Sequence, residues 1–355
     1  MTVSERRTMS NKDFNLSANS FDLLRLIGAG FVLLSHSFRH FNLTKPVWSL
    51  FFMDGSIGVM IFFAITGFLI MPAWERSQKK EHPYKSYFWN RIIRIYPGII
   101  FSFLLITLID GLLIKENVFS LNYLVYMFKY CILSRGSQYG ANGLSNGVLW
   151  TILPDIVYYI LTPFIWKFLK KLKTWQWILL IVVFWQFNIF DSWTISVFKQ
   201  IPLFGKLVGD GFPLCFMYQF LIGSFLYFKR ETILAFFIKH KLYAYLWLIA
   251  FTAFYEFFYL TDVFPKNWVM HSPVIAIMAV PLSIVMGYAL GDHHVKIDIS
   301  YGVFLIHMIV IGTLKFLGVS GYIGVLLVLV IGPVLALLYC IAIEKPVLKL
   351  KTLVK

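Results

Sequence analysis

Ionisable side chains of types that move protons interrupt an apolar stretch near the start of this sequence. The stretch FDLLRLIGAGFVLLSHSFRHF begins at Phe21 and contains Asp22, Arg25 and His36. In an α-helix, the step from Arg25 to His36 turns through about 1100°, which is about 20° more than three full turns, and rises about 16 Å. Arg25 and His36 therefore lie on one stripe of the helix, where a neutral imidazole is a candidate general base.

A carboxylate in another apolar stretch is a candidate partner for this imidazole. Asp155 ends the segment NGVLWTILPD and falls about 12 Å from the outer end of its helix, a depth similar to that of His36. Such a carboxylate would hold one tautomer of the imidazole, as the acid of a hydrolase triad does. The alternative is a structural role for each residue, with Arg25 reaching lipid head groups and His36 making a single hydrogen bond.

The elements that carry these residues are expected to be transmembrane helices. Hydrophobic residues make up 59% of the chain, charged residues 14%, and the mean hydropathy is +0.74. A helix needs about 20 apolar residues to cross roughly 30 Å of hydrocarbon. The sequence therefore predicts an all-α, polytopic membrane protein with about ten transmembrane helices, near residues 21–41, 55–73, 95–114, 147–166, 175–190, 211–228, 242–260, 268–290, 299–317 and 321–342.

The distribution of Lys and Arg predicts the orientation of these helices. Cytoplasmic loops are enriched in both residues, and strongly basic loops alternate with less basic ones in this chain if both termini are cytoplasmic. The expected organisation is a cytoplasmic tail over residues 1–20, a ten-helix transmembrane domain over 21–343 and a basic cytoplasmic tail over 344–355. A shorter apolar stretch, 121–133, contains Lys129 and is expected to be an interfacial or re-entrant piece of an outer loop.

The net charge of +15 does not indicate a nucleic-acid partner. The basic residues are dispersed over separate loops, where they suit the anionic lipids of an inner leaflet. Cys131, Cys215 and Cys340 lack the spacing of a disulfide framework or a metal site. No metal cofactor is therefore expected, and membrane lipids are the expected partners of the basic loops.

Six segments of the chain carry recognisable motifs. They read GSIGVMIFFAITGFLI, YFWNRIIRIYPG, NGVLWTILPD, FLIGSFLY, DISYGVFLIH and IEKPVLK. Together with the spacing of Arg25 and His36, they resemble the acyltransferase-3 family of membrane-bound bacterial acyltransferases over residues 20–346. Many members of that family O-acetylate surface polysaccharides. Thr66 stands where the family usually has Ser, and Asp155 stands where it usually has Glu.

The resemblance implies a donor and a location. The donor is a coenzyme A thioester, most often acetyl-CoA, that is made in the cytoplasm, and the protein is a multi-pass protein of the bacterial cytoplasmic (inner) membrane. Arg91, Arg94 and Tyr96 match the arginine-rich start of the family's third helix. With Arg25, they are expected to bind the coenzyme, the arginines through its phosphates. The alternative for Arg91 and Arg94 is ordinary positive charge flanking a helix.

The residues and the resemblance together predict O-acyl transfer. His36 acts as general base on an acceptor hydroxyl, which attacks the thioester carbonyl. Asp155 orients the imidazole, and an arginine such as Arg25 or a backbone donor stabilises the oxyanion. A covalent acyl-His intermediate is the alternative route. The acceptor is expected to be a hydroxyl of a lipid-linked or exported glycan, and the supporting residues are Asp22, Asn146, Trp150, Tyr301 and His307.

A transporter is the competing class of function. Intramembrane Asp, His and Arg side chains are also what a proton-coupled transporter or flippase of polysaccharides or small molecules needs, without acyl-transfer chemistry. The chain has no internal repeat of the kind that many transporters have. A scaffold protein is a third class, but it gives no reason for the stripe that carries Arg25 and His36.

Overall fold

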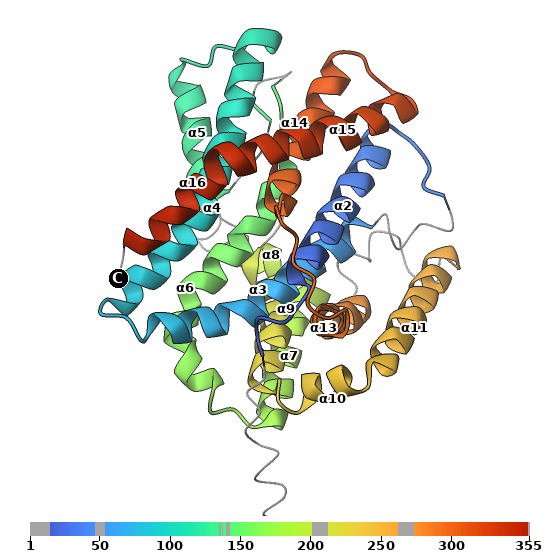
Figure 1. The fold of residues 1–355 in the computed structure, drawn as a ribbon. Coiled ribbons are helices and arrows are strands. Elements are labelled where there is room, and N and C mark those ends of the chain that lie inside the picture. The colour runs from blue at the N-terminus through green and yellow to red at the C-terminus, as the bar shows by residue number, and fades with distance from the viewer. Residues whose placement is uncertain are drawn as a thin grey trace, which may run out of the picture.

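Helices whose sequences are apolar over most of their length make up the fold. Every regular element is a helix in the residues that the structure describes, which confirms the predicted all-α class (Figure 1). The structure is a computed structural model, and it describes residues 15–46, 54–134, 136, 138–139, 143–200, 212–261 and 273–353.

Each of the ten predicted apolar runs corresponds to a helix. In chain order these helices are α2 (Phe21–His40), α3 (Gly55–Ser77), α4 (Pro83–Ile109), α6 (Ile152–Leu169), α7 (Thr174–Ile189), α9 (Pro213–Phe228), α11 (Lys241–Leu260), α13 (Pro273–Ala289), α14 (Ser300–Phe316) and α15 (Gly321–Tyr339). Shorter helices lie between or after them: η3 (Asp110–Ile114), α5 (Leu121–Leu133), η4 (Gly147–Thr151), α8 (Asp191–Lys199), α10 (Ile233–Lys239), η5 (Cys340–Glu344), α16 (Lys345–Leu348) and η6 (Lys349–Leu353).

The lengths of these helices support a multi-pass membrane protein. In the described residues, six segments are long and apolar enough to cross a membrane: α2, α3, α4 with η3, η4 with α6, α11, and α15 with its continuation to Lys351. The helices α9, α13 and α14 are apolar but shorter, and α7 with α8 passes the same test only as a bent pair. Ten crossings and two cytoplasmic termini stay predictions.

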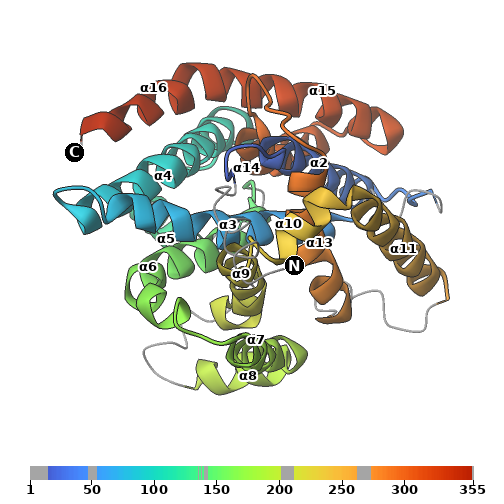
Figure 2. The same cartoon turned by 60° about the horizontal axis from the view of Figure 1, so that its bottom comes forward.

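The central helix of the bundle is α3, which contacts α2, α4, α6, α9 and α13. Most residues of α3 are buried, and the helix is apolar on all sides, as expected for a helix enclosed by other helices. Figure 2 shows α15 and α16 as an outer layer over α4 and α2, with α7 and α8 at the opposite edge. The elements that surround α3 are therefore the ones that can line a cavity beside it.

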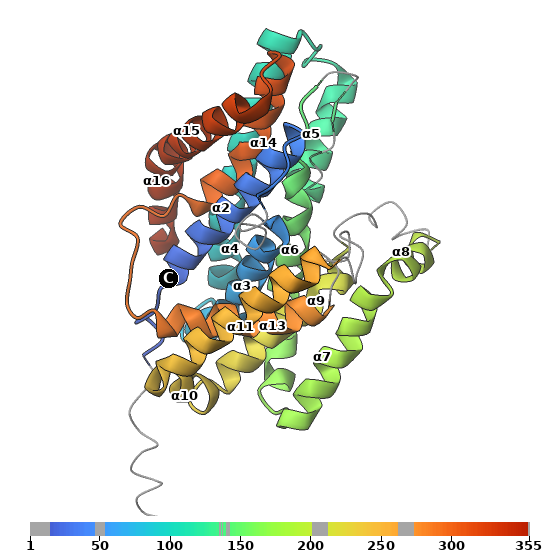
Figure 3. The same ribbon diagram turned by 90° about the vertical axis from the view of Figure 1, so that its right-hand side faces the viewer.

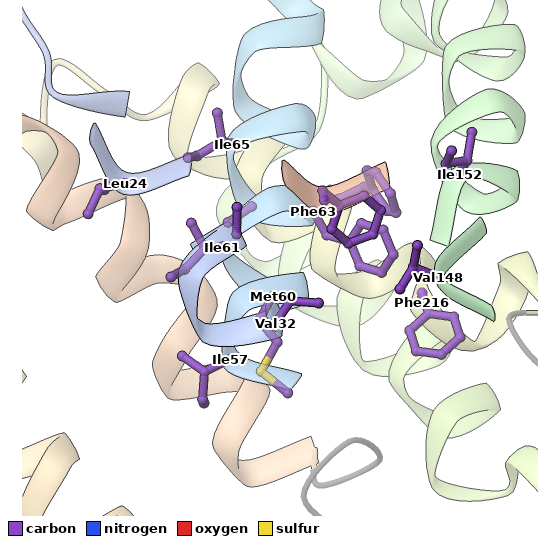
Figure 4. Packing of buried hydrophobic residues seen from close by; sticks show 14 of the residues in the cluster. Leu24, Val32, Ile57, Met60, Ile61, Phe63, Ile65, Val148, Ile152 and Phe216 are labelled. Carbon is purple, nitrogen blue, oxygen red and sulfur yellow. The ribbon is translucent and has the colours of Figure 1, made fainter. Parts of the chain in front are cut away.

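Glycines allow α3 to approach its neighbours closely. A Cβ atom at Gly58 would lie 2.4 Å from the carbonyl oxygen of Gly28 on α2, and one at Gly67 would lie 2.3 Å from the carbonyl oxygen of Phe220 on α9. Small residues at such contacts let helix backbones pack directly, which stabilises helix pairs in membranes. Figure 4 shows the apolar side chains of α2, α3, α6 and α9 that pack together in the core around α3.

The predicted interfacial or re-entrant segment is the helix α5, which lies beside the upper end of α4 in two views (Figures 1 and 3). Tyr123, Tyr126 and Tyr130 are buried against Phe103 of α4. The other side of α5 exposes large apolar side chains, Phe128 among them. This face suits contact with lipid chains, and the interfacial or re-entrant position stays a prediction.

The predicted basic C-terminal tail, 344–355, is helical over its described residues, and its cytoplasmic position stays a prediction. The elements η5, α16 and η6 continue α15 as far as Leu353, and α16 and η6 contact α4. Trp89 of α4 donates a hydrogen bond from Nε1 to the carbonyl oxygen of Leu350 at 3.0 Å. Parts of the predicted tails and spans lie outside the described residues, namely 1–14, 211, 268–272 and 354–355.

Replacing Gly67 by Ala should destabilise the bundle, because the new methyl group meets backbone atoms of Phe220 that cannot move alone. Overpacking of this kind costs about 1–3 kcal/mol, which the melting temperature of the detergent-solubilised protein would report. Gly30→Ala on α2 is the control, because nothing lies within 4 Å of a Cβ atom there. Equal melting temperatures for the two variants would contradict the close contact between α3 and α9.

Candidate functional site

A cavity of about 200 Å³ lies between α2, α3, α4, α6, α14 and η5. Its lining changes from charged to apolar along three of these elements. On each of these elements a charged lining residue lies about one to four turns from an apolar one. The pairs, charged residue first, are Arg76 and Phe62 on α3, Asp155 and Ile152 on α6, and Asp298 and Phe304 just before and within α14.

Arg25 reaches the charged end of the cavity from the first turns of α2. Its Nη1 atom lies 3.0 Å from Oδ1 of Asp22, one turn earlier on the same helix, and the side chain is only 14% exposed. The other carboxylate oxygen of Asp22 lies 3.5 Å from Nδ1 of His294. Asp22 therefore pairs with one end of the Arg25 guanidinium, and the other N–H donors of this guanidinium are available to the cavity.

Arg91 and Arg94 are three residues apart on α4 and therefore share one face of that helix. Both line the cavity. The guanidinium of Arg91 lies over the rings of Tyr87 and Tyr159, at 5.8 and 5.4 Å from their centroids. Its buried Nε atom has no hydrogen-bond partner among the described residues. This arginine is held in place by aromatic rings while one of its N–H donors stays unused.

Asp155 lies among these arginines. Its carboxylate is close to the Thr66 hydroxyl and within electrostatic reach of Arg25, Arg91 and Arg94. Its buried Oδ1 atom has no hydrogen-bond partner in the part of the chain that the structure describes. Asp155 therefore offsets part of the positive charge of the cavity and retains one free acceptor.

The hydrogen-bond partner of His36 is another histidine. Nδ1 of His36 lies 2.8 Å from Nε2 of His307 on α14, and the two ring planes are within 14° of each other. Nδ1 of His307 lies 3.0 Å from the carbonyl oxygen of Val303. No hydrogen bond joins His36 to Asp155 in the described residues, so the structure differs from the expected pair.

The depth of α6 explains this difference. The expected pairing assumed that the helix begins at the outer surface. Instead, Asn146, which precedes η4 and α6, donates a hydrogen bond from Nδ2 to the carbonyl oxygen of Leu305 at 2.9 Å. Leu305 lies in the first half of α14, next to the cavity residue Phe304. Because the helix starts inside the bundle, Asp155 lies deeper than expected, at the charged end of the cavity.

The histidine pair lies beyond the apolar end of the cavity. Phe304 lines that end, and its ring centroid is 6.3 Å from that of His307. Phe62, another lining residue, packs edge-to-face on Phe304 with centroids 5.5 Å apart. We call the part of the cavity lined by Arg25, Arg91, Arg94 and Asp155 the charged chamber. From one end to the other, the site therefore consists of this charged chamber, the rings of Phe62 and Phe304, and the histidine pair.

Of four other predicted site residues, one lines the cavity and three lie elsewhere in the bundle. Tyr301 lines the cavity and donates a hydrogen bond to the carbonyl oxygen of Ile95 at 2.7 Å. Tyr96 is partly buried in the apolar core and is not among the described lining residues. The same is true of Trp150, whose ring packs on Phe216 with centroids 5.0 Å apart. Asn146 is fully buried and anchors η4.

Three charged lining residues were not predicted as site residues: Arg76, Asp298 and Glu344. Asp298 and Glu344 belong to the motifs DISYGVFLIH and IEKPVLK, and an acid at the edge of an apolar run was the signal that could have identified them. Glu344 ends the π-helical segment η5, a type of element that is frequent at functional sites. Within the described residues, no group of three or more His, Cys, Asp or Glu side chains is arranged to hold a metal ion.

The chain is similar to known proteins over almost its whole length. The family described as an acyltransferase domain matches residues 18–345. A protein named nodulation protein 10, from Rhizobium leguminosarum bv. viciae, is 27% identical over an alignment of 390 positions, which covers 97% of this chain and 96% of that protein. A protein named O-acetyl transferase, from Shigella phage Sf6, is 27% identical over 174 residues that cover 47% of this chain and 51% of that protein. No solved structure matches the chain.

Replacing Asn146 by Ala should destabilise the protein, because it removes the donor to Leu305 and a second hydrogen bond, at 2.8 Å, to the Tyr130 hydroxyl. Loss of buried hydrogen bonds of this kind costs about 1–3 kcal/mol. Tyr130→Phe is the control, since it removes the hydroxyl, with its bonds to Asn146 and to the Ser102 hydroxyl, but keeps the bond from Asn146 to Leu305. A melting temperature for Asn146→Ala at or above that of Tyr130→Phe would contradict the anchoring of η4 on α14.

Proposed function

Because the chain belongs to the acyltransferase-3 family of membrane acyltransferases, we propose that it moves an acetyl or other short acyl group from acyl-CoA to a hydroxyl of a surface or exported glycan. The protein would lie in the cytoplasmic membrane of a bacterium, with the charged end of the cavity toward the cytoplasm. The observation that carries this proposal is the cavity, which is lined by arginines and whose apolar lining residue Phe304 packs beside His307, the hydrogen-bond partner of His36.

Arg25, Arg91 and Arg94 bind the phosphates of the donor in this proposal. Charged phosphates do not enter hydrocarbon, but a protein cavity with guanidinium donors can receive them. The unpartnered Nε atom of Arg91 is a donor that a phosphate oxygen would use. Asp155, Asp298 and Glu344 limit the positive charge of the cavity, which lowers the cost of keeping several guanidiniums together.

The pantetheine arm of the donor would extend from this charged chamber along the apolar end of the cavity, past Phe62 and Phe304. The thioester then approaches His36 from the side of the cavity. His36 takes the proton of the acceptor hydroxyl, the hydroxyl oxygen attacks the thioester carbonyl, and the thiolate of coenzyme A leaves. The name of the relative from Shigella phage Sf6 supports an oxygen atom as the acceptor.

Arg91→Ala and Arg94→Ala should each raise the KM for acyl-CoA about 10-fold to 100-fold, because each loses on the order of 1.5–3 kcal/mol of charge-assisted hydrogen bonding. Coenzyme A at 100 times its Kd should stabilise the wild-type protein by about 2.7 kcal/mol, and less in these variants. A transporter without acyl-transfer chemistry would show neither effect.

The matched control for the arginines is Arg230→Ala. Arg230 also stacks on a tyrosine, at 4.5 Å from the centroid of Tyr227, and also has an unpartnered Nε atom among the described residues, but it does not line the cavity. The KM for acyl-CoA should therefore stay at the wild-type value in Arg230→Ala. Equal increases of KM in Arg230→Ala and Arg91→Ala would argue against a donor site in the cavity.

Replacing His36 by Ala should abolish acyl transfer, because the acceptor hydroxyl loses its base. Removal of a general base costs typically 10²–10⁴-fold in rate. Stabilisation by coenzyme A should persist in His36→Ala, since the imidazole lies beyond the apolar end of the cavity. Acyl transfer is measured with radiolabelled acetyl-CoA and membrane glycans, and turnover at the wild-type rate would remove His36 from the mechanism.

A further inference from the structure

His36 and His307 form a hydrogen-bonded pair whose second member has no role in the reaction described so far. Nδ1 of His36 lies 2.8 Å from Nε2 of His307, and Nδ1 of His307 lies 3.0 Å from the carbonyl oxygen of Val303, one turn earlier on α14. His307 is fully buried. Nε2 of His36 has no hydrogen-bond partner in the residues that the structure describes.

The bond to Val303 determines where the hydrogens of the pair are. A carbonyl oxygen can only accept, so Nδ1 of His307 carries a hydrogen and donates it. In a neutral His307 the other nitrogen, Nε2, then has a lone pair and accepts a hydrogen bond from Nδ1–H of His36. In a neutral His36 this leaves the lone pair on Nε2.

The surroundings of the pair favour the neutral form of both rings. An unpaired charge inside an apolar bundle costs several kcal/mol, and within the described residues no carboxylate forms an ion pair with either ring. The hydrogen-bond network therefore has one arrangement that satisfies every atom within it.

We propose that His307 is a positioning residue for acyl transfer, which holds His36 in the Nδ1–H tautomer and so leaves Nε2 of His36 free to take the proton of the acceptor hydroxyl. This inference rests on the proposed role of His36 as the base. His307 does not line the cavity and touches neither substrate. It acts through His36, as the acid of a hydrolase triad acts through its histidine.

The proton cycle balances with this tautomer. Nε2 of His36 takes the hydroxyl proton while the hydroxyl oxygen forms a bond to the thioester carbonyl carbon. The C–S bond then breaks, and the proton on Nε2 passes to the departing sulfur, which gives the ester and free coenzyme A. Throughout, Nδ1–H of His36 stays bonded to His307, so the ring returns to its starting tautomer without rotation.

The test variant is His307→Leu, which removes the acceptor and keeps an apolar side chain in the bundle. Turnover should fall about 100-fold to 10,000-fold, the range of a general base's contribution, and the loss of a triad's orienting acid, about 10,000-fold, is its upper end. The KM for acyl-CoA should stay within about twofold of the wild-type value, because the lost interaction concerns the reaction and not donor binding. His307→Gln supplies an amide oxygen as acceptor and should recover at least about tenfold of the lost turnover.

His40→Leu is the matched control. The ring of His40 lies one turn from His36 on α2, with centroids 6.2 Å apart, but no hydrogen bond joins the two rings in the described residues. Turnover in His40→Leu should therefore stay within about twofold of the wild-type value, as expected for a residue without a specific role.

Nitrogen-15 NMR of the protein labelled at histidine gives a readout that a merely structural role of His307 would not change. The signals of His36 are identified by their loss in His36→Gln. In the wild-type protein they should report a hydrogen on Nδ1 and a lone pair on Nε2. In His307→Leu they should move toward the tautomer with the hydrogen on Nε2.

Two results would overturn the role of His307. One is wild-type turnover in a stably folded His307→Leu protein, and the other is a wild-type His36 with its hydrogen on Nε2. If His307→Leu does not fold, the turnover of His307→Gln and the wild-type spectrum decide the question. Failure of the proposed function is a separate result, since the wild-type protein would then transfer no acyl group, and failure of His36 as the base would appear as turnover in His36→Ala.

Discussion

Burial of charge inside an apolar helix bundle is the constraint on which the rest of this structure depends. Each guanidinium or carboxylate would cost several kcal/mol alone in hydrocarbon, so these groups are tolerated together and around a cavity. This requirement brings α2, α4, α6, α14 and η5 around one cavity beside α3. The charged residues that share the cavity are Arg25, Arg76, Arg91, Arg94, Asp155, Asp298 and Glu344.

The proposed base needs the opposite environment. A cluster of guanidiniums close to an imidazole would oppose its protonation during the reaction. On α2, Arg25 and His36 are separated by about 16 Å along the helix axis, and the rings of Phe62 and Phe304 lie between the charged chamber and His307. Acyl-CoA carries its phosphates at one end and its thioester at the end of a long, thin arm. This shape would let its phosphates contact the arginines while its thioester lies near His36.

The helices and the shared stripe of Arg25 and His36 could be predicted because both depend on local properties. The thickness of a membrane imposes a length on each apolar helix, and the period of one helix determines which of its residues share a face. Contacts between helices depend on where each helix begins, which the hydrophobic pattern does not determine. Asp155 was therefore expected beside His36. Because Asn146 is hydrogen-bonded to α14, however, α6 begins inside the bundle, and Asp155 lies close to the arginines. His307 was recognised as an ionisable group in the bundle, but its contact with His36 depends on the packing of α2 on α14.

The central claim is that one donor molecule reaches from the arginines to His36. A structure determined in a lipid nanodisc with a non-hydrolysable thioether analogue of acetyl-CoA would test it most directly. The account predicts phosphates against Arg91 and Arg94, and an acyl carbonyl carbon near Nε2 of His36 with room for one hydroxyl oxygen about 3 Å from each. Phosphates bound away from these arginines, or an acyl group that remains at the charged end of the cavity, would contradict it.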